Sequence, residues 1–219
     1  MVHKDYSIIP EDFQFVLNYL FKAEGGIVHR NKTEADITNG YGIYRAAHPR
    51  ARVWDNIDAC AKSLGICGPS SSWCGRDIQA INKALNKEED RFLSYLFYVD
   101  YYKPALLEEL PRNCILYGIS IYANGPKLYG RSVQIAVNEF IKAGHLKGDL
   151  LLVDGNLGPK SAAAVNAIKA MDSKKHEIFK SILLDVTKDQ YVRLADSNPS
   201  KYGRYKRGWL HRVESLRNV

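Results

Sequence analysis

Lys22-Ala23-Glu24-Gly25-Gly26 decides how the first part of this 219-residue chain folds, because it ends a helix and leaves one carboxylate at its end. The apolar residues before it recur at spacings of three and four, which indicates one buried helix face: Phe13, Val16, Leu17, Leu20 and Phe21. Glu24 continues this stripe, so we expect its side chain to point toward the core. The glycine pair is typical of a helix C-terminus.

A carboxyl group in this position has the properties of a proton donor. Burial raises the pKa of a carboxyl group, and the negative end of the helix dipole acts in the same direction. A Glu held neutral near neutral pH can act as a general acid. The alternative is a partly exposed Glu in the last helical turn with no chemical role, and these five residues alone do not decide between the two.

The composition is that of a globular protein with an excess of positive charge. Hydrophobic residues make up 46% and charged residues 25%, and the net charge is +7, which predicts an anionic partner at some stage. Nucleic acid, an anionic membrane and a polyanionic cell wall all fit this charge. The basic stretch 201–217 lacks a nucleic-acid recognition motif, so we favour the cell wall and expect no nucleic-acid partner.

The cysteines and histidines predict no metal site. Four cysteines are too few for a disulfide scaffold in a chain of this length, and they miss the short Cys-x-x-Cys spacing of structural zinc: Cys60, Cys67, Cys74 and Cys114. We expect free thiols and no cofactor. The absence of 18 consecutive apolar residues, and of an apolar core in Met1–Tyr6, predicts a chain without signal peptide or stable membrane insertion.

The remaining pattern is helical, without a convincing alternating strand or an internal repeat, so we predict a mainly α fold. Residues 25–42 are dense in turn formers and predict a long irregular loop beside Glu24, and 65–75 predict a surface excursion. We expect further helices at 55–64, 76–85, 88–102, 114–122, 131–143, 159–168 and 177–194, followed by a basic tail.

Several short motifs occur in a specific order along most of the chain. In the first part these are Glu24-Gly25-Gly26, Thr38-Asn39-Gly40-Tyr41-Gly42-Ile43, Arg45-Ala46-Ala47-His48-Pro49, Tyr101-Tyr102-Lys103-Pro104 and Asn124-Gly125-Pro126. Later ones are 133–138, 154–161 and 207–213. Together they resemble glycoside hydrolase family 108 and its C-terminal peptidoglycan-binding region. Ile27 replaces the aromatic residue that follows the glycine pair in the family. Residues 60–73 form an insertion that is atypical of the family, and its alternatives are a lid, a specificity loop or a partner contact.

The resemblance implies a lysozyme-like helical enzyme that cleaves the bond between N-acetylmuramic acid and N-acetylglucosamine in peptidoglycan. Glu24 would protonate the leaving oxygen. Asp36 and Thr38 are similar in order to the Asp and Thr of phage-type lysozymes, where Thr38 would hold a water and Asp36 would polarise it. Glu34 competes with Asp36 for this role, and either acid can instead be an exposed loop residue.

Five residues are predicted to contact substrate, and most have a structural alternative. Glu34 is the acid that competes with Asp36. The alternative for Asn39 is to close a turn, for Tyr41 to anchor the loop to the core, and for Asn124 to cap a helix. Tyr102 belongs to an aromatic helix in which core packing is common. Trp209 is expected to anchor the C-terminus rather than to bind sugar.

We predict that residues 1–110 form the catalytic part and that 111–219 form a helical peptidoglycan-binding part packed against it. The protein is expected to be a monomer, made in the cytoplasm and acting on the wall in the periplasm or after release. A holin-like pore, a secretion route or lysis would export it, as for a phage endolysin or a toxin-release factor. The rival hypotheses are a non-catalytic wall-binding secretion factor and a lytic transglycosylase.

Overall fold

The computed structural model describes residues 8–30 and 34–219, and this part of the chain is built almost entirely from helices. Within these residues there are nine α-helices and the structure is 67% helical, which confirms the predicted mainly α class. Within the same residues, β pairing is limited to two isolated bridges, His29 with Thr38 and Thr38 with Tyr44.

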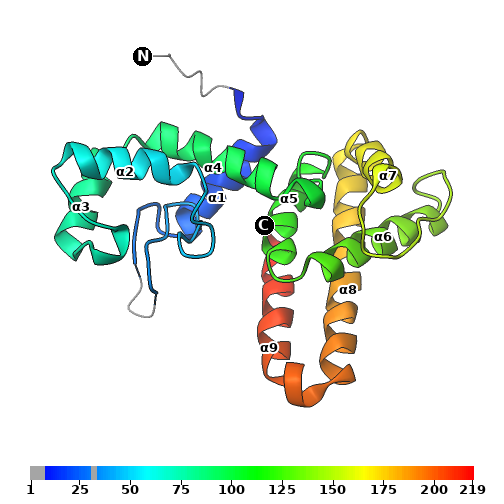
Figure 1. Cartoon of the computed structure of the whole chain (residues 1–219). Helices are drawn as coiled ribbons and strands as arrows, with labels where there is room; N and C mark the ends of the chain where they lie inside the picture. Colours follow the sequence, from blue (N-terminus) through cyan, green and yellow to red (C-terminus); the bar gives the residue numbers. More distant parts are fainter. Residues whose placement is uncertain (1–7, 31–33) are drawn as a thin grey trace. The chain divides into compact units, whose positions relative to one another are not determined.

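The chain divides into two compact units, which we call unit 1 (residues 1–101) and unit 2 (residues 102–219) (Figure 1). The boundary that we predicted after residue 110 falls inside unit 2. The residues just after Tyr101 belong to unit 2 because they pack on its helices: the Tyr129 hydroxyl donates to the Ala105 carbonyl at 2.6 Å, and the Tyr102 and Tyr122 rings lie 5.3 Å apart.

Unit 1 is organised around α4, which contacts both α1 and α2, while α3 packs on α2. The predicted stripe of α1 is buried, and the Phe13 ring meets the α4 residue Tyr95 edge-on at 5.1 Å. A long irregular segment joins α1 to α2. The helices are α1 (Glu11–Ala23), α2 (Val53–Ser63), the 3₁₀ turn η2 (Ser70–Ser72), α3 (Gly75–Ala84) and α4 (Lys87–Tyr101).

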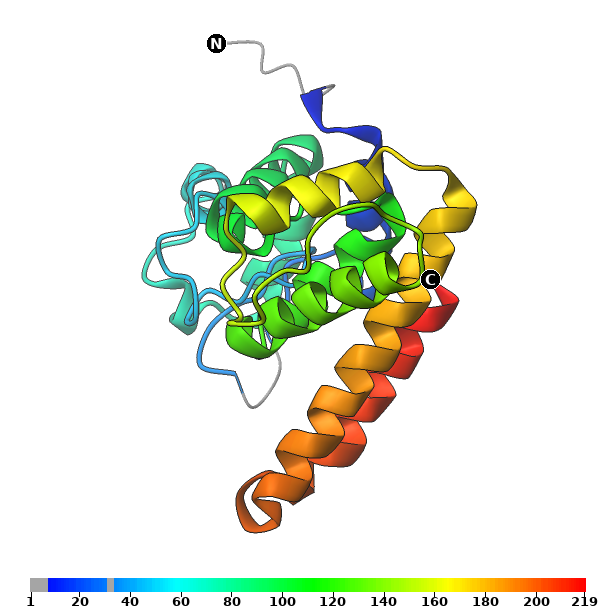
Figure 2. The same ribbon diagram turned by 90° about the vertical axis from the view of Figure 1, so that its right-hand side faces the viewer.

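Unit 2 contains an antiparallel hairpin of two long helices, α8 and α9, that run side by side (Figures 1 and 2). Its core includes the fully buried side chains of Tyr117, Phe140 and Phe179, and the Tyr117 hydroxyl is hydrogen-bonded to Thr187 at 2.7 Å. The elements are η3 (Lys103–Ala105), α5 (Arg112–Tyr122), α6 (Pro126–Lys142), α7 (Pro159–Lys169), α8 (Ser173–Ser197), α9 (Pro199–Ser215) and η4 (Leu216–Asn218).

The stretch that we predicted to be a basic tail is helix α9, which is the main correction to the predicted elements. Asn198 caps it by accepting from the Lys201 amide at 3.1 Å, and Pro199 occupies its first turn, where a missing N–H has no consequence. Its glycines and many charges lower its local helix propensity. Packing of Val213 and Trp209 on the α8 side compensates for this.

Candidate functional site

Helix α1 ends where the glycine pair predicts, and Glu24 is the residue that caps it. The Glu24 amide donates to the Leu20 carbonyl at 2.8 Å, and the next two residues have positive φ, +86° at Gly25 and +66° at Gly26. The Glu24 side chain is exposed, so our expectation that it faces the core is wrong. Lys22, Ala23 and Gly25 are exposed as well.

The loop after α1 folds back onto this helix end through two glycines. A Cβ atom at Gly42, whose φ is +83°, would lie 3.1 Å from both Cδ and Oε1 of Glu24. One at Gly40 would lie 3.0 Å from the carbonyl carbon of Gly26 and 3.1 Å from the Ile27 nitrogen. The Glu24 carboxyl group therefore rests against the backbone at Gly42, in a space that a larger residue would fill.

Thr38 lies in the middle of the folded loop and is 5% exposed. Its backbone exchanges two hydrogen bonds with His29, at 2.8 and 2.9 Å, and it bridges to Tyr44 on its other side. The Thr38 hydroxyl donates to Glu34 Oε2 at 3.5 Å. Of the two acids that competed for the role beside Thr38, Glu34 is therefore the one that contacts it.

Asp36 instead connects the loop to the atypical insertion. Its Oδ1 accepts from the Ser70 hydroxyl at 2.6 Å and from the Ile37 amide at 2.8 Å. The Arg30 guanidinium donates to the carbonyls of Ser71 and Trp73, at 2.5 and 2.6 Å. The turn at residues 70–73 is thus attached to the loop at two points.

Asn39 is fully buried, and its amide group organises the loop from inside. Its Oδ1 accepts from the amides of Tyr41 and Ile43 at 3.1 and 3.0 Å, and its Nδ2 donates to Ser94 Oγ at 2.9 Å and to Asp90 Oδ1 at 3.4 Å. The Asn39 side chain therefore has no exposed surface here, and its contacts are those of the turn-closing alternative. Hydrogen bonds to its own loop leave the Asn39 side chain with a structural role.

Two of the tyrosines predicted to bind substrate are buried as well, which agrees with the anchoring and core-packing alternatives for them. Tyr41 is 4% exposed, its ring lies 5.3 Å from that of Phe21, and its carbonyl accepts from the Tyr98 hydroxyl at 2.7 Å. Burial, followed by the nearby Asp90 carboxyl, raises the pKa of Tyr41 well above its ordinary value. Tyr102, in unit 2, is 6% exposed.

Asn124 is exposed at the end of α5 in unit 2, where its Nδ2 donates to the Ser120 carbonyl at 2.8 Å. This contact satisfies one of the last carbonyl groups of α5. The N-cap of the next helix is Gly125 and has no side-chain cap, so the predicted N-capping role of Asn124 is wrong. The described contacts of Asn124 all lie within unit 2.

Asp90, which is not among the predicted site residues, is a buried carboxyl group of unit 1. It is 4% exposed on α4, and burial raises its pKa from 3.8 to about 7, while the hydrogen bond from Asn39 acts in the opposite direction. An acid in the first turn of a helix normally faces solvent beside the helix dipole. The signal that identifies Asp90 is its spacing of three, four and seven residues from Leu93, Ser94 and Phe97 on the buried face.

In unit 2, the motifs at 133–138 and 154–161 are joined by hydrogen bonds. Gln134 on α6 donates to Asp154 Oδ1 at 2.8 Å and to the Asn156 carbonyl at 2.9 Å, and its own Oε1 accepts from the Gly155 amide at 2.7 Å. A Cβ at Gly130 would clash with the Gly155 carbonyl oxygen, so the turn lies directly on the helix backbone. The hydrogen bond from Gln134 is the main reason why the pKa of Asp154 falls to about 2.

Trp209 on α9 lies within a stack of aromatic rings. Tyr191 stacks on it at 5.0 Å and Tyr205 at 5.7 Å, with interplanar angles of 20° and 24°. The Arg204 guanidinium in turn lies 4.6 Å from the centre of the Tyr205 ring. Trp209 therefore anchors α9 to α8, as expected.

The described residues hold neither a metal-binding cluster nor a membrane-spanning helix. Within residues 8–30 and 34–219, no group of three or more His, Cys, Asp or Glu side chains is arranged to hold a metal ion, and all four cysteines are free thiols. None of the helices in the described part combines the length and the apolar character needed to cross a bilayer.

Comparison with known proteins gives one match. Residues 139–214 match a family described as a predicted peptidoglycan domain, a stretch that runs from the end of α6 to α9 within unit 2. No curated protein and no solved structure gave a match. The family match supports association of this chain with peptidoglycan and hence a place of action at the cell wall.

Proposed function

We propose that this protein is a peptidoglycan hydrolase in which unit 2 holds the wall and unit 1 cleaves the bond between N-acetylmuramic acid and N-acetylglucosamine. The observation that carries the proposal is the position of Glu24, an exposed carboxyl group at a helix end, packed against Gly42 of a loop that is fastened from inside. The peptidoglycan family match in unit 2 supports the same substrate, as does the resemblance to glycoside hydrolase family 108.

The chemistry needs a proton for the leaving oxygen and a second group for the sugar carbon. Glu24 is the proposed proton donor, because its carboxyl group is exposed and can reach a glycan strand lying across the end of α1. Because Gly42 has no side chain, the loop backbone can pack directly against this carboxyl group. Pre-positioning of this kind reduces the reorganisation that the reaction requires.

For the second group we propose Glu34 together with Thr38. The hydrogen bond between the Thr38 hydroxyl and Glu34 makes them a pair that can hold and polarise a water molecule. Asp36, the first choice from the resemblance, has Oδ1 engaged by Ser70 and by its own loop. In this proposal Asp36 positions the loop, and Glu34→Gln lowers activity more than Asp36→Asn.

Loss of turbidity of purified peptidoglycan near neutral pH tests the proposal. Glu24→Gln should abolish lysis, with rates at least about a hundredfold below wild type, because general acid catalysis contributes this much. Glu11→Gln is the matched control, since Glu11 is an exposed acid at the other end of the same helix. Equal loss in both variants, or full activity of Glu24→Gln, would refute the role of Glu24.

A second candidate is a wall-binding protein without hydrolytic activity. It is favoured by the position of the family match, which lies entirely within unit 2 and leaves unit 1 unmatched. This candidate predicts that wild type and Glu24→Gln sediment equally with insoluble peptidoglycan and that neither lowers its turbidity. Sedimentation and turbidity measured on the same samples separate the two candidates.

A further inference from the structure

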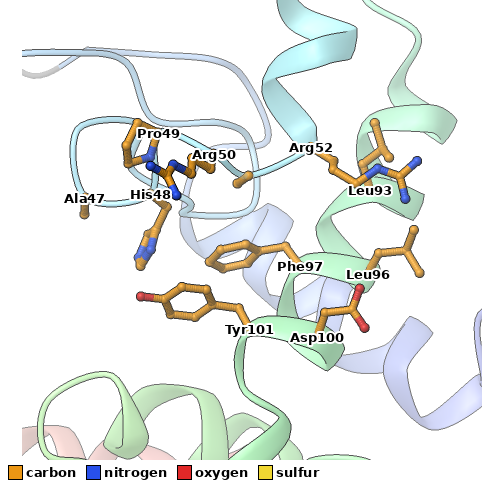
Figure 3. Close-up of a pocket in the computed structure, with 11 residues that line it drawn as sticks. Ala47, His48, Pro49, Arg50, Arg52, Leu93, Leu96, Phe97, Asp100 and Tyr101 are labelled. Carbon is orange, nitrogen blue, oxygen red and sulfur yellow. The ribbon is translucent and has the colours of Figure 1, made fainter.

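A groove of about 430 Å³ lies in unit 1 between residues 47–52 and the second half of α4 (Figure 3). No residue assigned above to the Glu24 site lines it. The α4 wall is aromatic, with the Phe97 and Tyr101 rings stacked 5.1 Å apart. His48, from the 47–52 wall, packs edge-on against both rings, at 5.0 and 4.7 Å. Tyr101 is 56% exposed, so the α4 wall is open to a ligand.

The wall formed by residues 47–52 is held in shape by hydrogen bonds to its backbone. The His48 amide donates to the Tyr44 carbonyl at 3.0 Å, and the His48 carbonyl accepts from the Ala51 amide at 3.1 Å and from the Trp54 indole at 2.7 Å. Burial lowers the pKa of His48, so its ring adds an aromatic edge rather than a charge at neutral pH. The groove is therefore formed before any ligand arrives.

Three exposed charged side chains surround the groove. Arg50 and Arg52 extend from the 47–52 wall, and Asp100 extends from α4 on the other side (Figure 3). None of the three takes part in an ion pair with another described residue. The groove thus combines two guanidinium groups, one carboxylate and an apolar interior.

We propose that this groove binds the acidic stem peptide of peptidoglycan, a substrate assignment that rests on the function proposed above. The stem peptide is a short chain of alanine and dicarboxylic residues with several free carboxylates and, in many walls, a free amine. Arg50 and Arg52 pair with the carboxylates, Asp100 takes the amine, and the alanine methyl groups lie against Phe97 and Tyr101.

The charges favour the peptide over the glycan as the occupant. Guanidinium groups recognise carboxylates with paired, charge-assisted hydrogen bonds, whereas a strand of N-acetylated sugars carries none once its lactyl groups are joined to peptide. A glycan would use the Tyr101 ring but leave both arginines without partners. Recognition of the peptide would restrict the enzyme to strands that still carry their stems.

An NMR titration of the full-length protein with a stem tetrapeptide tests this assignment without requiring catalysis. The peptide should shift the signals of His48 and Tyr101, and the double variant Arg50→Gln/Arg52→Gln should bind it at least about tenfold more weakly. Arg76→Gln, which changes an exposed arginine on α3 outside the groove, should bind as wild type does. Chitotetraose serves as the neutral glycan probe.

Absence of peptide binding, unchanged affinity in the double variant, or stronger binding of chitotetraose to the same signals would overturn the assignment. If the peptide binds in the groove but the protein does not cleave peptidoglycan, the groove is a stem-peptide site and the proposed hydrolase function is refuted. Cleavage without groove-dependent peptide binding would refute the assignment alone.

Discussion

Replacing Asp90 by Asn should remove a pH dependence from the stability of unit 1. Folding raises the pKa of Asp90 from 3.8 to about 7, because the carboxyl group is buried. The folded chain therefore holds a proton that the unfolded chain releases between these two values. Stability from this group is greatest below the unfolded pKa and is lost as the pH rises toward the folded one.

The magnitude follows from the two pKa values. Each pKa unit corresponds to about 1.4 kcal/mol, so complete ionisation costs about 4 kcal/mol, and the loss between about pH 5 and about pH 8 is about 2.5 kcal/mol. Asn occupies the same space, accepts the same hydrogen bond from Asn39 and does not titrate. The variant should therefore lose about 2.5 kcal/mol less than the parent protein over this interval.

Tryptophan fluorescence during urea unfolding can measure this difference in unit 1 alone. The three tryptophans are Trp54 and Trp73 in unit 1 and Trp209 in unit 2, so a Trp209→Phe background leaves both reporters in unit 1. The comparison is made with and without Asp90→Asn in this background at each pH, which cancels the titration of all other groups. If the free energy of unfolding changes with pH in the same way in both proteins, the claim that Asp90 is buried and protonated in the folded state is refuted.

Two further predictions concern the turns that support the two units. Gly42→Ala should lower lytic activity at least about tenfold, because the new Cβ would press on the Glu24 carboxyl group and the backbone φ at this position is positive. The control is Gly65→Ala, a position with a similar φ where a Cβ would meet nothing within 4 Å, and this variant should keep its activity. Equal loss of activity in the two variants would contradict the proposed contact with Glu24. Gln134→Ala removes three hydrogen bonds to the 154–156 turn, which should lower the stability of unit 2 by about 2 to 4 kcal/mol. The variant should also sediment less with peptidoglycan. Unchanged sedimentation would show that this turn has no part in binding the wall.

Most helices of the fold are predictable because their apolar residues follow the helical period and their ends carry glycine or proline. The glycine pair after Glu24 and Pro159 at the start of α7 mark such ends. Helix α9 is not predictable in this way, because it depends on the partner helix: Trp209 stacks on Tyr191, and Lys206 pairs with Asp196 at 2.7 Å.

The candidate site was predictable in its residues but not in their surroundings. The helical spacing extended to Glu24 implied burial, but Glu24 is the C-cap of α1 and its side chain is exposed. Asn39 and Tyr41 were recognisable as polar and aromatic loop residues, but only the fold places them beneath the loop, next to α4. The burial of Asp90 likewise depends on a loop that lies about fifty residues earlier in the chain.

Digestion of purified peptidoglycan in water labelled with heavy oxygen, followed by mass spectrometry of the fragments, tests the central claim most directly. We predict that the wild-type protein releases muropeptides with one heavy oxygen at each new reducing end, and that Glu24→Gln releases none. Unlabelled anhydro fragments would show a transglycosylase instead. Sedimentation with the wall and no released fragments from either protein would contradict hydrolysis and leave a wall-binding protein.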